Sequence, residues 1–152
     1  MALPNIFTKE VSDSIIHRIH QLTPQTQAQW GTMGVAQMLA HCCVTYEMVY
    51  DNLHKKANFL MGFILKMLVK PTVVSEKPYK HNSGTAPQFV IKDSRDFDKE
   101  KQRLIAYIQK TQALGEAHFE GKESLSLGVL TKTEWNNLFY KHLDHHLRQF
   151  GA

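Results

Sequence analysis

The C-terminal segment of the chain has an apolar side that repeats with the period of an α-helix. At about 100° per residue, a helix through this segment gathers its large apolar side chains on one face; these are Trp135, Leu138, Phe139, Leu143, Leu147 and Phe150. His142 and His146 fall within the same face, one turn apart. Two imidazoles directed into a protein interior need polar partners, and one divalent metal ion can satisfy both.

The rest of the hydrophobic pattern predicts an all-α fold. We expect helices over residues 8–22, 34–51, 93–114 and 131–150, because apolar residues recur in each at helical spacing. Thr131 and Glu134 have the spacing of a capping box, which marks the start of the last helix. A chain of 152 residues has the size of one domain. We therefore expect residues 1–152 to form a single four-helix bundle.

Two stretches depart from this pattern. Residues 59–69 predict one extra short helix, apolar almost all round, that ends at Lys70 and Pro71. Such a helix is buried or covers a partner, and it is too short to span a membrane. Residues 72–92 predict a long ordered loop with short extended pieces at 72–74 and 88–91, and long loops in compact domains are often functional. A further glycine-containing loop is expected after residue 114.

Composition excludes several classes of function. The formal charge is +4, but basic and acidic residues are interspersed, so nucleic-acid binding is not indicated. Cys42 and Cys43 are adjacent and form no disulfide framework, which indicates a reducing compartment. No secretory signal is visible, so we expect a cytoplasmic location. No phosphate-binding glycine loop, nucleophile elbow, paired-carboxylate signature or Glu-x-x-His di-iron spacing is present.

A catalytic metal typically has three protein ligands and one open position, so the histidine pair needs a third ligand. His41, on the edge of the apolar stripe of residues 34–51, is the best candidate. The residues alone leave open whether it ligates a metal or forms a hydrogen bond with a neighbour. His118 is a weaker candidate because we expect it in a loop, and Cys42 fits a small buried apolar residue better than a thiolate ligand.

Three residues near these histidines are candidates for supporting roles. Gln149 projects near His142 and can serve as its hydrogen-bonding partner, or lie at a solvated helix end. Tyr46 and Glu47 follow His41 by one to two turns and can act as acid or base toward a bound water. The alternatives are core packing for Tyr46 and surface exposure for Glu47.

Other polar residues are expected to lie outside the site. His145 falls on the flank of the last helix, where a surface or packing role is expected, and Asp144 points to the opposite, solvated face. His17 and His20 have a spacing that permits joint ligation, but they fall away from the apolar stripe of their helix. They remain a minor alternative.

Three segments resemble the DinB/YfiT-like superfamily of helical bundles, within a branch of uncharacterised bacterial proteins. They are Trp30–Cys42, Leu127–Trp135 and Tyr140–Gly151, and the resemblance extends through most of the chain. It implies a four-helix bundle with an up-down-down-up course and a metal site formed by His41, His142 and His146. Relatives of this branch often carry His-Pro-x-Phe-Gly before the last helix, where this chain has Ser124-Leu-Ser-Leu-Gly128.

The resemblance also bears on function. Some relatives with such a site are metal-dependent transferases that use low-molecular-weight thiols such as bacillithiol or mycothiol, many have no known activity, and relatives often dimerise. We therefore expect a divalent metal, zinc or nickel above others, and a small-molecule substrate handled by thiol transfer or hydrolysis. The alternatives are a non-catalytic module that binds a small molecule or protein, and membrane-surface association through residues 59–69 and their flanking lysines.

Overall fold

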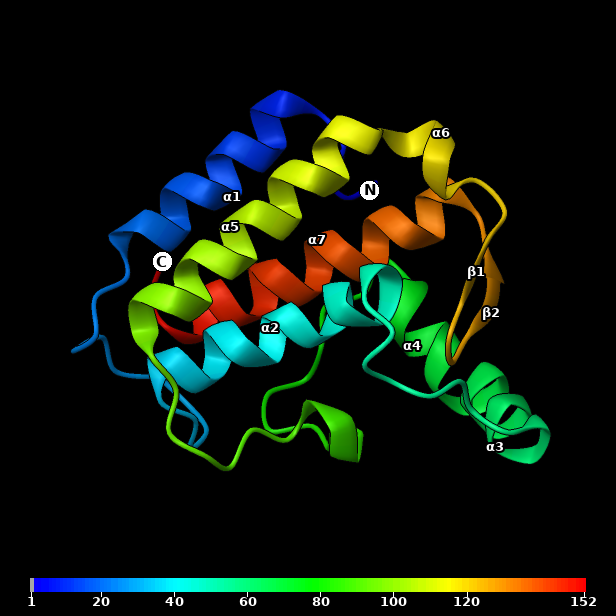
Figure 1. Cartoon of the computed structure of the whole chain (residues 1–152), viewed down its shortest axis with the longest axis horizontal. Coiled ribbons are helices and arrows are strands. Elements are labelled where there is room, and N and C mark those ends of the chain that lie inside the picture. The colour runs from blue at the N-terminus through cyan, green and yellow to red at the C-terminus, as the bar shows by residue number, and fades with distance from the viewer. Residues whose placement is uncertain (1) are drawn as a thin grey trace.

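The computed structural model describes residues 2–152, and four long helices form the body of this region (Figure 1). The helices are α1 (Lys9–Gln21), α2 (Val35–Tyr50), α5 (Phe97–Leu114) and α7 (Lys132–Gln149). They pack as a ring in the order α1, α5, α2, α7. Helices α1 and α7 run in one direction and α2 and α5 in the other, as Figure 1 shows. The prediction of an all-α four-helix bundle is confirmed.

Local hydrogen bonds fix where these helices begin. The Thr131 hydroxyl accepts from the backbone N–H of Glu134 at 3.2 Å, and the Glu134 carboxylate accepts from the backbone N–H of Thr131 at 2.9 Å. This is the predicted capping box. Asp96 accepts from the backbone N–H of Lys99, so α5 begins at Phe97, slightly later than expected.

A continuous apolar core lies between the four helices. Its fully buried members come from all four helices and from the short connections; they include Ile19, Met38, Leu39, Ile108, Phe119, Phe139 and Leu143. The N-terminal segment closes one end of this core, because the backbone N–H of Ile6 donates to the side chain of Asn136 at 2.7 Å. The core holds α2 and α7 at fixed positions, which matters because both carry candidate ligands.

The connection between α2 and α5 contains one continuous helical stretch. It comprises α3 (Phe59–Ile64), a π-helical turn η1 (Leu65–Val69) and α4 (Lys70–Val74). The predicted end of the helix at Pro71 and the predicted extended piece at 72–74 are therefore wrong. A proline ring normally clashes with the carbonyl four residues earlier. The backbone N–H of Lys70 instead bonds Leu65, five residues back, and this wider turn accommodates the proline.

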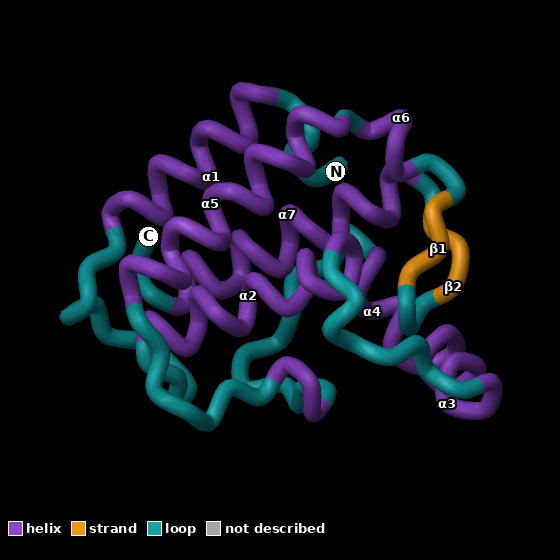
Figure 2. Tube along the Cα trace, in the orientation of Figure 1, coloured by secondary structure: helices purple, strands orange, loops and turns teal. Residues whose placement is uncertain are grey.

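Short elements complete the fold (Figure 2). A 3₁₀ turn, η2 (Pro87–Phe89), replaces the extended piece expected at 88–91. The expected glycine-containing loop instead holds α6 (Glu116–Phe119) and an antiparallel hairpin of β1 (Lys122–Ser124) and β2 (Gly128–Leu130), in which Glu123 lies opposite Val129. Strands of this length are too short to produce a recognisable alternation in sequence.

Residues 59–69 form neither a membrane-spanning helix nor a buried one. Within residues 2–152, none of the helices combines the length and apolar character needed to cross a bilayer. The outer side of α3 is open to solvent, and the Phe59 side chain is 93% exposed. The first of the two predicted alternatives for this helix, burial, is wrong.

Candidate metal centre

Three histidines meet between α2 and α7. His41 comes from α2, and His142 and His146 come from successive turns of α7. One ring nitrogen of each lies within 4.8 Å of the others, and the Nε2 atoms of His41 and His142 are 3.0 Å apart. Nitrogen ligands at tetrahedral zinc are separated by about 3.3 Å, given zinc–nitrogen bonds of about 2.0–2.1 Å. The His41–His142 separation is close to this value, so the cluster can hold a metal ion.

Each of the three rings is held through its other nitrogen. His41 Nδ1 lies 2.8 Å from the backbone oxygen of Phe89. His142 Nδ1 lies 3.0 Å from the hydroxyl of Thr45. His146 Nδ1 lies 2.8 Å from the side-chain oxygen of Gln149. Metal-binding imidazoles typically have such a partner on the nitrogen that faces away from the ion, because it fixes the ring orientation and the tautomer.

The partners determine where two of the protons lie. A backbone carbonyl only accepts, so His41 donates from Nδ1 to Phe89. The Gln149 amide nitrogen donates to the backbone oxygen of Trp30 at 2.8 Å, and its oxygen therefore accepts from His146 Nδ1. In both neutral rings the lone pair is then on Nε2. Thr45 can donate or accept, so it is compatible with either tautomer of His142.

A tight turn beside the cluster holds Gln149. Gly31 has a φ of +80°, and a Cβ added there would lie 2.7 Å from the Gln149 amide nitrogen. Only glycine combines this backbone conformation with such a close approach. The turn therefore lets the Trp30 carbonyl reach Gln149, which in turn orients His146.

Burial keeps the histidines uncharged. It lowers the pKa of His41, although the hydrogen bond to Phe89 acts in the opposite direction. Burial lowers the pKa of His142 well below its usual value, and the neighbouring His146 and His41 lower it further. Burial, followed by the proximity of His41, lowers the pKa of His146 to about 3. Neutral imidazole is the form that binds metals.

A cavity of about 760 Å³ opens onto the three histidines. This volume is in the range of small-molecule sites. Two of its walls are α2 and α7, and the others come from three connections: residues 30–33, 65–92 and 124–127. The expected functional loop thus forms part of the cavity wall.

The lining changes in character along the cavity. Apolar side chains gather on the part lined by the later turns of α2, the π-helical turn and the first turns of α7: Met48, Val49, Leu65, Val69, Trp135 and Leu138. The charged side chains among the described lining residues are Lys80 and Lys92. Among the described residues no carboxylate contributes to the lining. The cavity therefore suits a partly apolar molecule that is neutral or anionic.

The other predicted neighbours occupy different places. Gln149 bonds His146 one turn away, and not His142 as expected. Tyr46 lies in the core between the rings of Tyr107 and Phe139, and it is not part of the cavity lining. Its hydroxyl has no hydrogen-bond partner among the described residues.

His145 and Asp144 also differ in part from expectation. The His145 ring packs against Trp30 and Tyr79, as its expected packing role requires. It also lines the cavity beside His146, which the sequence did not indicate. Asp144 is not solvated as predicted: it pairs with Arg18 and Arg148, both at 2.8 Å, and its side chain is 20% exposed.

The remaining candidates lie apart from the cluster. His17 and His20 are exposed on α1, and His118 is exposed on α6, a helix where a loop was expected. Cys42 is buried, and burial raises its thiol pKa well above the usual value, in keeping with its predicted role as a small apolar residue. The segment 124–127 lines the cavity with serine and leucine side chains and contributes no histidine.

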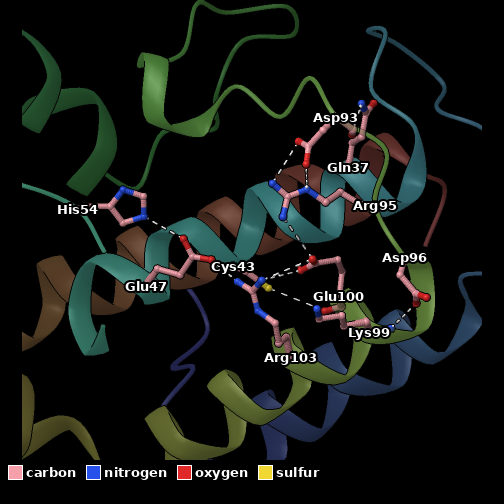
Figure 3. Close-up of polar contacts among 10 residues, drawn as sticks. All are labelled: Gln37, Cys43, Glu47, His54, Asp93, Arg95, Asp96, Lys99, Glu100 and Arg103. Carbon is pink, nitrogen blue, oxygen red and sulfur yellow. Dashed lines mark hydrogen bonds and ion pairs between the residues drawn. The ribbon is translucent and has the colours of Figure 1, made fainter. Parts of the chain in front are cut away.

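A separate ion-pair network joins α2, α5 and Arg95, which lies just before α5 (Figure 3). Glu47 on α2 pairs with Arg103 and with His54, so its predicted surface exposure is wrong. Glu100 pairs with Arg103 at 3.1 Å and with Arg95 at 3.5 Å. These residues do not line the cavity in the described part of the chain. The network thus fastens the segment between residue 92 and α5 to the bundle.

The fold and the site define a helical bundle with a largely buried three-histidine cluster that can hold a metal ion. Residues 6–152 match the model of a family described as protein of unknown function (DUF1569), and the chain belongs to this family. No curated protein and no solved structure matches the chain.

Proposed function

We propose that this protein binds one divalent metal ion through His41, His142 and His146 and acts on a small molecule in the adjoining cavity. The observation that carries the proposal is the direction of the three rings. Each Nδ1 is engaged by a protein group, which leaves the three Nε2 atoms as the nitrogens available to one ion. The resemblance to DinB/YfiT-like bundles supports the same three ligands.

The cavity favours an enzyme over a purely binding module. A site sealed by apolar side chains has no room for a substrate, whereas all three histidines line a cavity of about 760 Å³. When bound, the metal would supply Lewis acidity, which lowers the pKa of a thiol or water at neutral pH. The expected reaction class is thiol transfer or hydrolysis, with a low-molecular-weight thiol as one candidate substrate.

Protein groups supply orientation and selection. Gln149, Thr45 and the Phe89 carbonyl fix the ring planes, so little reorganisation accompanies metal binding. The apolar wall excludes water from one side of the substrate, and Lys80 and Lys92 favour an anionic one. Three imidazole ligands suit zinc and nickel, which are the metals that we propose.

Metal analysis of the purified protein tests this proposal. We expect about one equivalent of zinc or nickel in the wild type, and loss of the metal in His41→Ala and His142→Ala. His20→Ala is the matched control, because His20 is exposed on α1. Cobalt substitution adds a spectroscopic readout of a four-coordinate site that is independent of activity. Full metal content in both ligand variants would disprove the site.

A screen of the metal-loaded protein separates the two functional classes. Turnover of a thiol or ester substrate that is lost with His142→Ala supports the enzyme. Saturable binding of the same compounds without turnover supports the non-catalytic alternative.

A further inference from the structure

The helical stretch of α3 and η1 has an outer side that the bundle leaves uncovered. Its exposed large apolar side chains are Phe59, Leu60, Met61, Phe63, Ile64, Met67, Leu68 and Val69. Phe59 is 93% exposed and Leu68 is 72% exposed. We call these eight residues the apolar ridge. Contiguous apolar surface of this kind marks an interaction site.

The same helix has a different role on its inner side. Leu65 and Val73 are partly buried, pack against the core and line the cavity. This inner side anchors the helix, and Asn58 caps its start by accepting from the backbone N–H of Met61 at 2.9 Å. The α3 end projects from the body of the molecule, on the side where the β1–β2 hairpin lies (Figure 1). The ridge is therefore held outward by a folded support.

Positive charge concentrates in the same part of the chain. Residues 52–92 contain seven lysines and one acidic residue, a formal charge of +6, whereas the whole chain carries +4. The remainder of the chain therefore carries −2. Lys55 and Lys56 directly precede α3, Lys66 lies within the helical stretch and Lys70 follows η1. Lys56 and Lys70 pair with Glu123 and Glu134; with these two acids included, the segment still carries a formal charge of +4.

We propose that the apolar ridge docks on an anionic phospholipid surface. Aromatic and aliphatic side chains on a short helix insert at the headgroup boundary, and surrounding lysines are attracted to acidic lipids. The described residues hold no helix that can span a membrane, so the association is peripheral. A second copy of the chain is a less suitable partner. A two-fold interface through the ridge would bring two segments of charge +6 together.

Vesicle co-sedimentation tests this proposal with the full-length protein. We expect binding to vesicles of phosphatidylcholine with phosphatidylglycerol, little binding to phosphatidylcholine alone, and loss of binding at high ionic strength. The double variant Phe59→Ser, Phe63→Ser should reduce partitioning by at least about tenfold. Leu114→Ser is its control, because it removes an exposed apolar side chain from the far end of α5.

The charge contribution needs its own pair of variants. Lys66→Glu should reduce binding to the anionic vesicles, whereas Lys99→Glu, on the exposed side of α5, should leave it unchanged. All five substituted positions are solvent-exposed, so circular dichroism and the melting temperature should match the wild type. Metal content should also be unchanged, which separates this test from that of the metal site.

Three results would overturn the proposal. One is the absence of vesicle binding at low ionic strength. Another is equal binding by the wild type and by the Phe59→Ser, Phe63→Ser variant. The third is a wild-type dimer that this double variant converts to a monomer, with no vesicle binding by either, because the ridge would then be a subunit interface.

Discussion

His146 and Gln149 share a hydrogen bond whose direction is fixed by a third group. The Gln149 amide nitrogen donates to the Trp30 carbonyl, so the amide oxygen, 2.8 Å from His146 Nδ1, is the acceptor. His146 is thereby held as the tautomer with a free Nε2. The Trp30 carbonyl thus orients Gln149, and Gln149 holds His146 in the tautomer that can bind a metal.

Replacing this glutamine should weaken metal binding without abolishing it. In Gln149→Met the His146 ring loses its acceptor and can rotate or change tautomer, so we expect a decrease in metal affinity of about 10–100-fold. Competition with a chromophoric chelator measures the change. Gln109→Met, an exposed position of α5, is the control and should have wild-type affinity. Unchanged affinity in Gln149→Met would show that the hydrogen bond does not tune the site.

The stability of the metal-free protein should decrease on acidification. Burial lowers the pKa of His146 to about 3, and it also lowers the pKa of His41 and His142. An unfolded histidine titrates near pH 6.5, so below this pH the unfolded chain binds protons that the folded chain does not. The stabilisation is therefore fully present above about pH 6.5 and is lost as the pH falls toward the folded values.

Urea unfolding of the metal-free protein at several pH values checks this expectation. Below pH 6.5, each histidine should lower the free energy of unfolding by up to about 1.4 kcal/mol for each pH unit of acidification. His146→Gln should have a shallower pH dependence than the wild type, whereas replacing the exposed His20 with Gln should not. Identical slopes in all three proteins would contradict the prediction.

Removing the hydroxyl of Tyr46 should stabilise the protein. This hydroxyl is buried without a hydrogen-bond partner among the described residues, while its ring stacks on Tyr107 and Phe139. Tyr46→Phe keeps the stacking and removes the unsatisfied group, so we expect the free energy of unfolding to rise by about 1 kcal/mol. Tyr50→Phe is a matched comparison, because the Tyr50 hydroxyl lies 2.7 Å from that of Thr111. Tyr50→Phe should lower the free energy of unfolding. A lower free energy of unfolding in both variants would refute the argument.

Lys141 should stabilise the part of the cavity wall formed by the segment around Thr72 and Ser75. Its ammonium group donates to the backbone oxygens of Thr72 and Ser75, both at 2.6 Å, and lies 4.6 Å from the centre of the Tyr79 ring. In Lys141→Met the two carbonyls lose their charged donor. We therefore expect the free energy of unfolding to fall by about 2–3 kcal/mol. Chemical denaturation measures this change, and faster amide exchange over residues 70–80 should accompany it. Lys99→Met, which alters an exposed side chain, should change neither quantity.

Helical periodicity was sufficient to predict the bundle and two of the three candidate ligands. The spacing of His142 and His146 within one apolar stripe is a local property, and α7 indeed presents both to the interior. His41 could be ranked from the residues but not placed, because its contact with His142 spans 101 residues. The resemblance to the DinB/YfiT-like superfamily favoured His41 as the third ligand, and the structure brings the three histidines together.

Several partners in the site could not be predicted from the sequence. The Phe89 carbonyl reaches His41 from the 3₁₀ turn η2, and the Trp30 carbonyl reaches Gln149 across 119 residues. Backbone carbonyls are present at every residue, so no residue type marks them. The continuation of the helix beyond Pro71 was also missed, because the π-helical turn that accommodates the proline has no clear sequence signal.

The origin of the cavity walls has a consequence for how new activities can arise. All three histidines belong to α2 and α7, whereas residues 65–92 form a large part of the wall that faces them and lie in a single connection between α2 and α5. The metal-binding side chains and most of the variable wall thus lie in separate parts of the chain, and the Phe89 carbonyl, which holds His41, links the two. An exchange of this one connection that keeps the Phe89 contact can give a differently shaped cavity while the metal-binding groups stay in place.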